Sequence, residues 1–166
     1  MTTVIAVETP KGVILGSDSQ VTSYGKEPMN GPKYFKNGGV VFALAGRARF
    51  IQELRYERIP TVRGDVDRYV HTKLVPFIRN LAEKTELKEE NQFIVVVKDR
   101  VYKIDPDLTV SRSASKVYVI GSGTPWATAY LSTVSKVDES AVKKALEVAA
   151  KHDPYTSGPF HVSMGL

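Results

Sequence analysis

The sequence contains no cysteine, and only three of its 166 residues are histidine. Disulfides, thiolate nucleophiles and cysteine-based metal sites are therefore excluded, and His71, His152 and His161 do not have the spacing of metal ligands. No apolar run is long enough to span a bilayer, and no charged and apolar leader opens the chain. We therefore expect a cytoplasmic protein that uses no metal or cofactor and has no membrane partner.

The sequence also has no long cluster of basic residues alone, although the net charge is +5. Basic residues alternate with acidic ones, as in segments 53–58 and 83–90. This pattern is typical of solvated helix faces and not of a surface that follows a phosphate backbone, so we expect no nucleic-acid partner. Apolar residues make up 42% and charged residues 25% of the chain, which indicates a globular protein. The length predicts a single domain over residues 1–166.

The pattern of apolar residues predicts blocks of strands and blocks of helices. Residues 3–8 and 12–17 flank a turn that contains Pro10 and Gly12, which predicts a β-hairpin. A loop is expected over residues 25–32, a turn over 37–39, and a kink or restart at Pro76 in the second helix, which Asp65 should cap. Further strands are expected over residues 33–36, 40–45, 117–120 and 160–164, and a second hairpin over 92–97 and 101–104. Helices are expected over 47–58, over 66–81 with an apolar stripe along one face, over 124–134, and over 139–151 with Asp138 as its cap. Segregated blocks of this kind favour an α+β fold with packed sheets and outer helices.

The most informative residue is Thr2, because its small side chain should permit removal of Met1. The chain would then begin with a residue that carries both a hydroxyl nucleophile and a free α-amine. The amine has a reference pKa of about 7.7 to 8.0, which suits a general base at neutral pH. Taken alone, a threonine after the initiator methionine is more often an ordinary strand start.

Three further residues support a site at Thr2. An antiparallel hairpin brings Asp18, at the end of its second strand, close to Thr2 at the start of its first. Lys33 begins a later segment and could reach the same place, where its ammonium would favour the neutral form of the amine. Gly46 separates a buried strand from a helix and could offer its N–H to an oxyanion.

Two other motifs are weaker candidates. Gly121-Ser122-Gly123 lacks the lysine of a phosphate-binding loop. His152 and Asp153 are not accompanied by a Gly-x-Ser-x-Gly nucleophile motif, which argues against a Ser-His-Asp triad.

Taken in order, these residues resemble the proteasome β-subunit family and its HslV-type relatives, the N-terminal threonine hydrolases. The resemblance covers nearly the whole chain, and it rests on residues 2–7, 12–13, 16–23, 33–35, 45–46, 120–123, 145–151 and 153–158. It implies a four-layer αββα sandwich. It also implies that Thr2 is the nucleophile, its freed amine the base, Lys33 the group that lowers the amine's pKa, Asp18 the partner of Lys33, and Gly46 the oxyanion donor.

The resemblance implies further residues around the nucleophile. Ser122, Asp153 and Ser157 would support the threonine, although Asp153 and Ser157 are one residue further apart than in the proteasome pattern. A small apolar specificity pocket, and hence cleavage after apolar residues, would follow from the matching positions, which are Val21, Gly31, Phe35, Leu44 and Ala48.

The sequence therefore predicts a threonine-type endopeptidase that acts through a Thr2 ester intermediate. By resemblance it would form a homo-oligomeric ring, take peptides or unfolded proteins as substrates, and receive them from an ATP-dependent unfoldase. Two alternatives stay open: a threonine amidohydrolase or transpeptidase that works without a ring, and a non-catalytic scaffold subunit like the proteasome α-type subunits.

Overall fold

The computed structural model describes residues 2–22, 25–86 and 91–165. Its strands are β1 (Thr3–Thr9), β2 (Gly12–Ser17), β3 (Gln20–Thr22), β4 (Lys26–Pro28), β5 (Tyr34–Asn37), β6 (Val40–Ala45), β7 (Gln92–Val97), β8 (Arg100–Ile104), β9 (Val110–Ser111), β10 (Val117–Gly121) and β11 (His161–Met164). Its helices are α1 (Ala48–Tyr56), α2 (Val66–Tyr69), the π-helical turn η1 (Val70–Leu74), α3 (Val75–Lys84), α4 (Thr124–Thr133) and α5 (Glu139–His152).

The strands form two larger antiparallel sheets and one small hairpin. The first sheet has the order β10-β1-β2-β11, and the second has the order β5-β6-β7-β8-β9. The predicted hairpin of β1 and β2 is confirmed, with Val4 paired to Ser17 at one end and Thr9 to Gly12 at the other. The predicted hairpin of β7 and β8 is confirmed as well, and its turn residues Lys98 and Asp99 both have positive φ.

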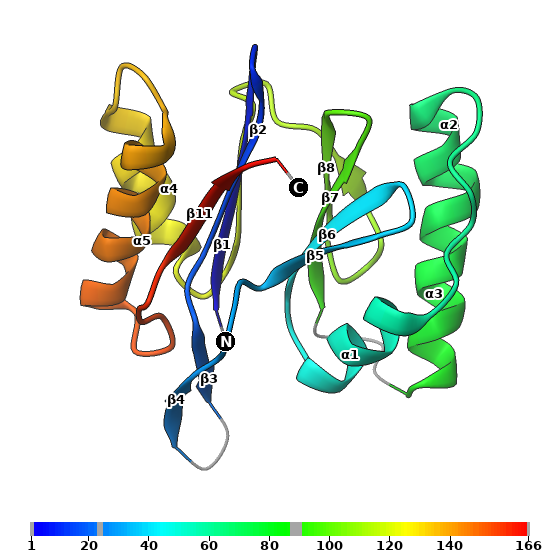
Figure 1. Ribbon diagram of the computed structural model, residues 1–166, viewed down its shortest axis with the longest axis horizontal. Helices are drawn as coiled ribbons and strands as arrows, with labels where there is room; N and C mark the ends of the chain where they lie inside the picture. The colour runs from blue at the N-terminus through cyan, green and yellow to red at the C-terminus, as the bar shows by residue number, and fades with distance from the viewer. Residues whose placement is uncertain (1, 23–24, 87–90, 166) are drawn as a thin grey trace.

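Three apolar clusters show how the sheets and helices pack. One lies between the second sheet and α1, α2 and α3, one between the two sheets, and one between the first sheet and α4 and α5. Figure 1 shows the same order, with α4 and α5 beyond one sheet and α2 and α3 beyond the other. Strand β6 is buried on both faces: Phe42 and Leu44 face the helices, whereas Val41 and Ala43 face the first sheet.

The segment from α2 to α3 explains the unusual position of Pro76. The predicted apolar stripe is buried, and the Asp65 side chain caps the helix by accepting a hydrogen bond from Arg68 N at 2.7 Å. A π-helical turn ends at Leu74, and Pro76 then lies in the first turn of α3, where its missing N–H is tolerated. The expected restart is therefore present, in the form of a π-helical turn.

Two short elements differ from the sequence expectation. Residues 25–32 were expected to form a loop, but residues 26–28 pair with residues 20–22 as the hairpin of β3 and β4, which projects beyond the N-terminus (Figure 1). Strand β9 also lies outside the predicted strands. Both are two- or three-residue strands, too short to show an alternating apolar pattern.

Candidate functional site

Thr2, Asp18 and Lys33 meet at the end of the first sheet. Because β1 and β2 are antiparallel, the residue before β1 and the residue after β2 lie side by side. The Asp18 carboxylate accepts hydrogen bonds from the Thr2 hydroxyl, from Thr3 N at 2.9 Å and from Gln20 N at 3.0 Å. The Lys33 ammonium donates to Thr2 Oγ1, to Asp18 Oδ1 at 2.8 Å and to the Gln20 carbonyl at 2.6 Å.

These contacts fix the direction of the Thr2 hydroxyl. Its oxygen accepts a hydrogen bond from Lys33, so its own proton points to Asp18. A lone pair on the oxygen is thereby held next to a cation, and the proton next to an anion. This arrangement favours loss of the proton when the oxygen attacks an electrophile.

The ion pair of Lys33 and Asp18 is almost fully buried, with side-chain exposures of 8% and 0%. Burial lowers the pKa of Lys33 from its ordinary value of 10.5, while the charge and hydrogen bond of Asp18, and to a lesser extent the charge of Asp153, oppose this shift. Desolvation penalises the charged ammonium, and its effect on the pKa of Lys33 is larger than the opposing effect of the two carboxylates. Lys33 is therefore a cation whose proton is held less tightly than on a surface lysine.

A second set of hydroxyl groups lies beside the backbone of Thr2. Ser122 donates to Asp153 Oδ2 at 2.6 Å and lies 3.4 Å from the Thr2 carbonyl oxygen. Thr156 donates to the same carboxylate oxygen at 2.5 Å, and its hydroxyl lies 2.6 Å from that of Thr3. The structure thus connects Ser122 and Asp153 to the start of β1.

Thr156 is a residue of this network that sequence reasoning missed. Ser157, which the resemblance favoured, contacts the site through its backbone carbonyl, which accepts from Ser19 N at 3.1 Å. The signal that could have identified Thr156 is its position three residues after Asp153, since that spacing lets the hydroxyl reach back to the carboxylate.

Gly46 lies at the same end of the molecule, between β6 and α1. Its neighbour Ala45 is paired with Gln92, and the Gln92 side chain accepts a hydrogen bond from Gly121 N at 3.0 Å. Gly121 is in turn paired with Thr3. Two strand pairings and one side-chain hydrogen bond therefore connect Gly46 to the strand that carries Thr2.

The five residues expected to line a substrate pocket lie in different surroundings. Phe35 and Leu44 are buried in the cluster under α1, where Phe35 stacks on Phe42. Val21 on β3 and Gly31 are half-buried, and Ala48 at the start of α1 is exposed. Of the five residues, Val21, Gly31 and Ala48 are therefore the ones accessible to solvent.

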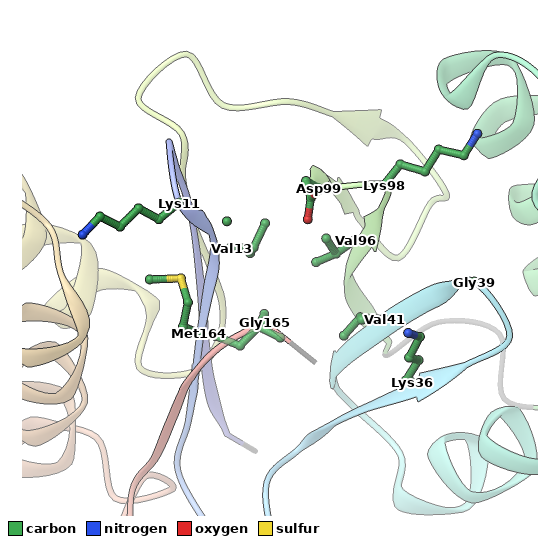
Figure 2. Close-up of a pocket in the computed structure, with 12 residues that line it drawn as sticks. Lys11, Val13, Lys36, Gly39, Val41, Val96, Lys98, Asp99, Met164 and Gly165 are labelled. Carbon is green, nitrogen blue, oxygen red and sulfur yellow. The ribbon is translucent and has the colours of Figure 1, made fainter.

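A cavity of about 270 Å³ is separate from the Thr2 site. It lies between the sheets near the turn of the β1–β2 hairpin, whereas Thr2 precedes the opposite end of β1. Its walls include Val13, Val41 and Val96, and Figure 2 shows the Lys11 and Lys98 side chains extending away from it.

No metal site and no membrane helix emerge from the described residues. Over 2–22, 25–86 and 91–165, no three histidine or acidic side chains gather in a way that could hold a metal ion. Across the same ranges, no helix has both the length and the apolar character required to cross a bilayer.

The packing of sheets and helices is that of HslV-like, proteasome-type proteins, so the resemblance inferred from the sequence is confirmed for the fold. BPH from Thiobacillus denitrificans, solved in complex with epoxomicin, superposes with a TM-score of 0.81 at 18% identity, covering 98% of this chain and 97% of that one. HslV from Trypanosoma brucei gives 0.68 at 21% identity, covering 97% of both chains. An Anbu mutant from Hyphomicrobium sp. strain MC1 gives 0.73 at 12% identity, covering 99% of this chain and 81% of that one. No protein-family model and no curated protein sequence matches the chain.

Proposed function

We propose that the protein is an N-terminal threonine peptidase with Thr2 as its nucleophile. The observation that carries the proposal is the buried contact of the Thr2 hydroxyl with both the Lys33 ammonium and the Asp18 carboxylate. A purely structural role would leave a costly ion pair buried around a small hydroxyl at the end of a strand. Activation of a weak nucleophile accounts for all three groups.

The proposed reaction begins once removal of Met1 has freed the α-amine of Thr2. Thr2 Oγ attacks the peptide carbonyl carbon, its proton passes to the amine, and the carbonyl oxygen becomes an oxyanion held by the N–H of Gly46. The carbon–nitrogen bond breaks as the leaving nitrogen takes the proton, which leaves an ester on Thr2. Water then attacks the ester carbon and gives a proton to the amine. The ester bond breaks, and Thr2 Oγ recovers the proton.

The supporting residues have separate tasks in this proposal. The Lys33 charge disfavours protonation of the nearby amine and so keeps it available as a base. Asp18 orients Lys33, and before the attack it also accepts a hydrogen bond from the Thr2 hydroxyl. Ser122 donates to the Thr2 carbonyl, and Asp153 orients Ser122 by accepting from it and from Thr156. Ser157 is proposed to support the threonine through the segment that follows Asp153.

The proposal extends to architecture and assembly. We take the packing order to be the four-layer αββα sandwich of a single domain, in the cytoplasm. Following the family resemblance, the chains would form a homo-oligomeric ring that encloses Thr2 and takes unfolded protein from an ATP-dependent unfoldase. The matches to BPH, HslV and Anbu over nearly the whole chain support the fold on which this proposed assembly is based. Mass photometry tests the assembly: a monomer or dimer would favour an amidohydrolase or transpeptidase that works without a ring.

The proposed cleavage preference follows from the surroundings of the site. None of the five expected pocket residues, Val21, Gly31, Phe35, Leu44 and Ala48, carries a charge, which favours cleavage after apolar residues. Digestion of a peptide library followed by mass spectrometry tests this preference. Cuts that follow only acidic or basic residues would contradict it.

The experiment that tests the function is intact mass before and after incubation with an epoxyketone such as epoxomicin, the compound bound in the Thiobacillus BPH structure. We expect loss of Met1 and one adduct per chain, located on Thr2 by peptide mapping. The matched control is Thr2→Ala, which keeps a small residue at position 2 so that Met1 still leaves, but has no hydroxyl. A chain that retains Met1 and forms no adduct would instead support the scaffold-subunit alternative.

A further inference from the structure

Two consecutive amide side chains at the start of β7 reach two backbone segments, one just after Gly46 and one in contact with Thr2. Asn91 precedes β7 and Gln92 is its first residue, so their side chains point to opposite faces of the second sheet. Phe93 and Ile94, the next two residues, follow the same alternation: Phe93 packs under the helices and Ile94 between the sheets. Asn91 therefore faces α1, and Gln92 faces the first sheet.

Asn91 holds the segment that contains Gly46. Its Oδ1 accepts a hydrogen bond from Arg47 N at 2.9 Å, and its side chain is 4% exposed. On the other side of Gly46, Ala45 is paired with Gln92. Because peptide units are planar, fixing the residues on both sides of Gly46 leaves its N–H little freedom of direction.

Gln92 holds the segment against which Thr2 lies. Its Oε1 accepts from Gly121 N at 3.0 Å. Gly121 packs so closely on Thr2 that a Cβ at that position would lie 1.9 Å from the Thr2 carbonyl oxygen. A shift of Gly121 would therefore move the backbone of Thr2.

We propose that Asn91 and Gln92 are positioning residues that set the distance between the oxyanion donor at Gly46 and the nucleophile at Thr2. Asn91 and Gln92 are joined by a single rigid peptide unit. The segment after Gly46 and the segment that contacts Thr2 are therefore held by the same short piece of backbone. The inference rests on the proposed peptidase function. A loss of this alignment weakens transition-state binding, because the donor must meet the oxygen where the charge develops.

The test uses Asn91→Leu and Gln92→Met, which keep the size of each side chain but remove the accepting oxygen. The matched control is Asn37→Leu, since Asn37 holds the other end of α1 by donating to the Leu54 and Glu57 carbonyls at 2.9 and 2.8 Å. Hydrolysis of a fluorogenic peptide with an apolar residue before the cut gives kcat and KM. A peptide aldehyde, whose adduct carries an oxygen in the oxyanion position, gives an inhibition constant.

We expect each Asn91 and Gln92 variant to lower kcat by about 10- to 100-fold with KM nearly unchanged, less than the loss from removing an oxyanion donor outright. The aldehyde should bind more weakly by a similar factor. Asn37→Leu should lower the melting temperature but keep kcat within about 2-fold, because residues that do not touch the transition state leave kcat in place.

Several outcomes would overturn the inference. Folded variants with the kcat and aldehyde affinity of the wild type would refute it, and so would a control that loses as much kcat as they do. Failure of both variants to fold would assign the pair to the stability of the sheet. A wild-type protein that neither cuts the peptide nor forms an epoxyketone adduct would refute the proposed function itself, which is a distinct result.

Discussion

Replacing Asp18 by asparagine tests the physical basis of the site. The carboxylate is fully buried and accepts from four donors, two of them backbone N–H groups and one the Lys33 ammonium. Asparagine has one accepting oxygen, and its NH₂ group must face at least one of these donors. Removing one partner of a buried ion pair costs about 3 to 5 kcal/mol, because the other charge stays desolvated and unpaired.

We therefore expect Asp18→Asn to lower the free energy of unfolding by about 3 kcal/mol at pH 7, the lower end of that range. Lys33 offsets part of the cost by releasing its proton, since burial has already lowered its pKa. Lys33→Met alone leaves the carboxylate with its other donors and should cost about the same. The double variant removes both charges and should be less destabilised than either single variant, by about 2 kcal/mol or more.

Urea unfolding monitored by the fluorescence of Trp126, the single tryptophan, provides the free energies. All variants are compared at one chain concentration, because association would otherwise change the apparent stability. Equal m-values show that the denatured states are comparable. A loss below about 1 kcal/mol for Asp18→Asn, or losses that simply add in the double variant, would refute the idea that the two charges depend on each other.

The remaining predictions concern residues around the site. Gly121→Ala should lower the stability far more than Gly31→Ala. The two glycines have nearly the same φ, +93° for Gly121 and +94° for Gly31, but a Cβ at Gly31 would have no atom within 4 Å, so Gly31→Ala should cost only about 1 to 3 kcal/mol. Calorimetry measures both losses, and equal losses would contradict the close packing of Gly121 on Thr2. Because burial lowers the pKa of Lys33 in the folded protein, the unfolded chain binds more protons at pH values between that pKa and 10.5. The stability of the wild type relative to Lys33→Met should therefore rise as the pH increases towards 10.5 in urea titrations, and a difference that falls with pH would contradict this sign. Thr156→Val should lower the stability by about 1 to 3 kcal/mol in thermal melting, because Asp153 loses a hydrogen-bond donor. Thr156→Ser keeps the hydroxyl, so its stability should stay near that of the wild type. Equal losses in the two variants would show that the hydroxyl does not contribute.

The sequence predicted strands and helices well where each carries a buried face. Strand β6 has the predicted bounds, and Asp138 caps α5 as expected, accepting from Ala141 N at 3.0 Å. The π-helical turn before Pro76 was not predicted, because its side chains follow the same apolar stripe as an α-helix. The hairpin of β3 and β4 was not predicted either, since a segment with Gly25 and Pro28 has the composition of a loop.

The site itself was harder to predict than the strands that carry it. Thr2 and Asp18 are joined by one hairpin, so local pairing alone brings them together. Asn91 and Gln92 reach Arg47 and Gly121, which are more than 25 residues away in the chain. The Asn91 contact depends on how β6 leads into α1, and the Gln92 contact depends on how the two sheets face each other. No apolar periodicity within a strand encodes either arrangement.

The placement of the chemistry at strand ends has a physical reason. Within a sheet, each backbone N–H and C=O is occupied by a neighbouring strand, so free donors and accepting side chains occur where pairing stops. Seven residues of the candidate site lie at such ends of the two facing sheets, namely Thr2, Asp18, Lys33, Gly46, Asn91, Gln92 and Ser122, whereas Asp153 and Thr156 follow α5. The sheets are held together by an apolar cluster, so the distances between these ends are set by the packing of the core and not by loops. A core substitution at Ile94 or Ile120, both fully buried between the sheets, should therefore reduce kcat as well as stability, and a variant that loses stability with kcat unchanged would show that the strand ends move independently of the core.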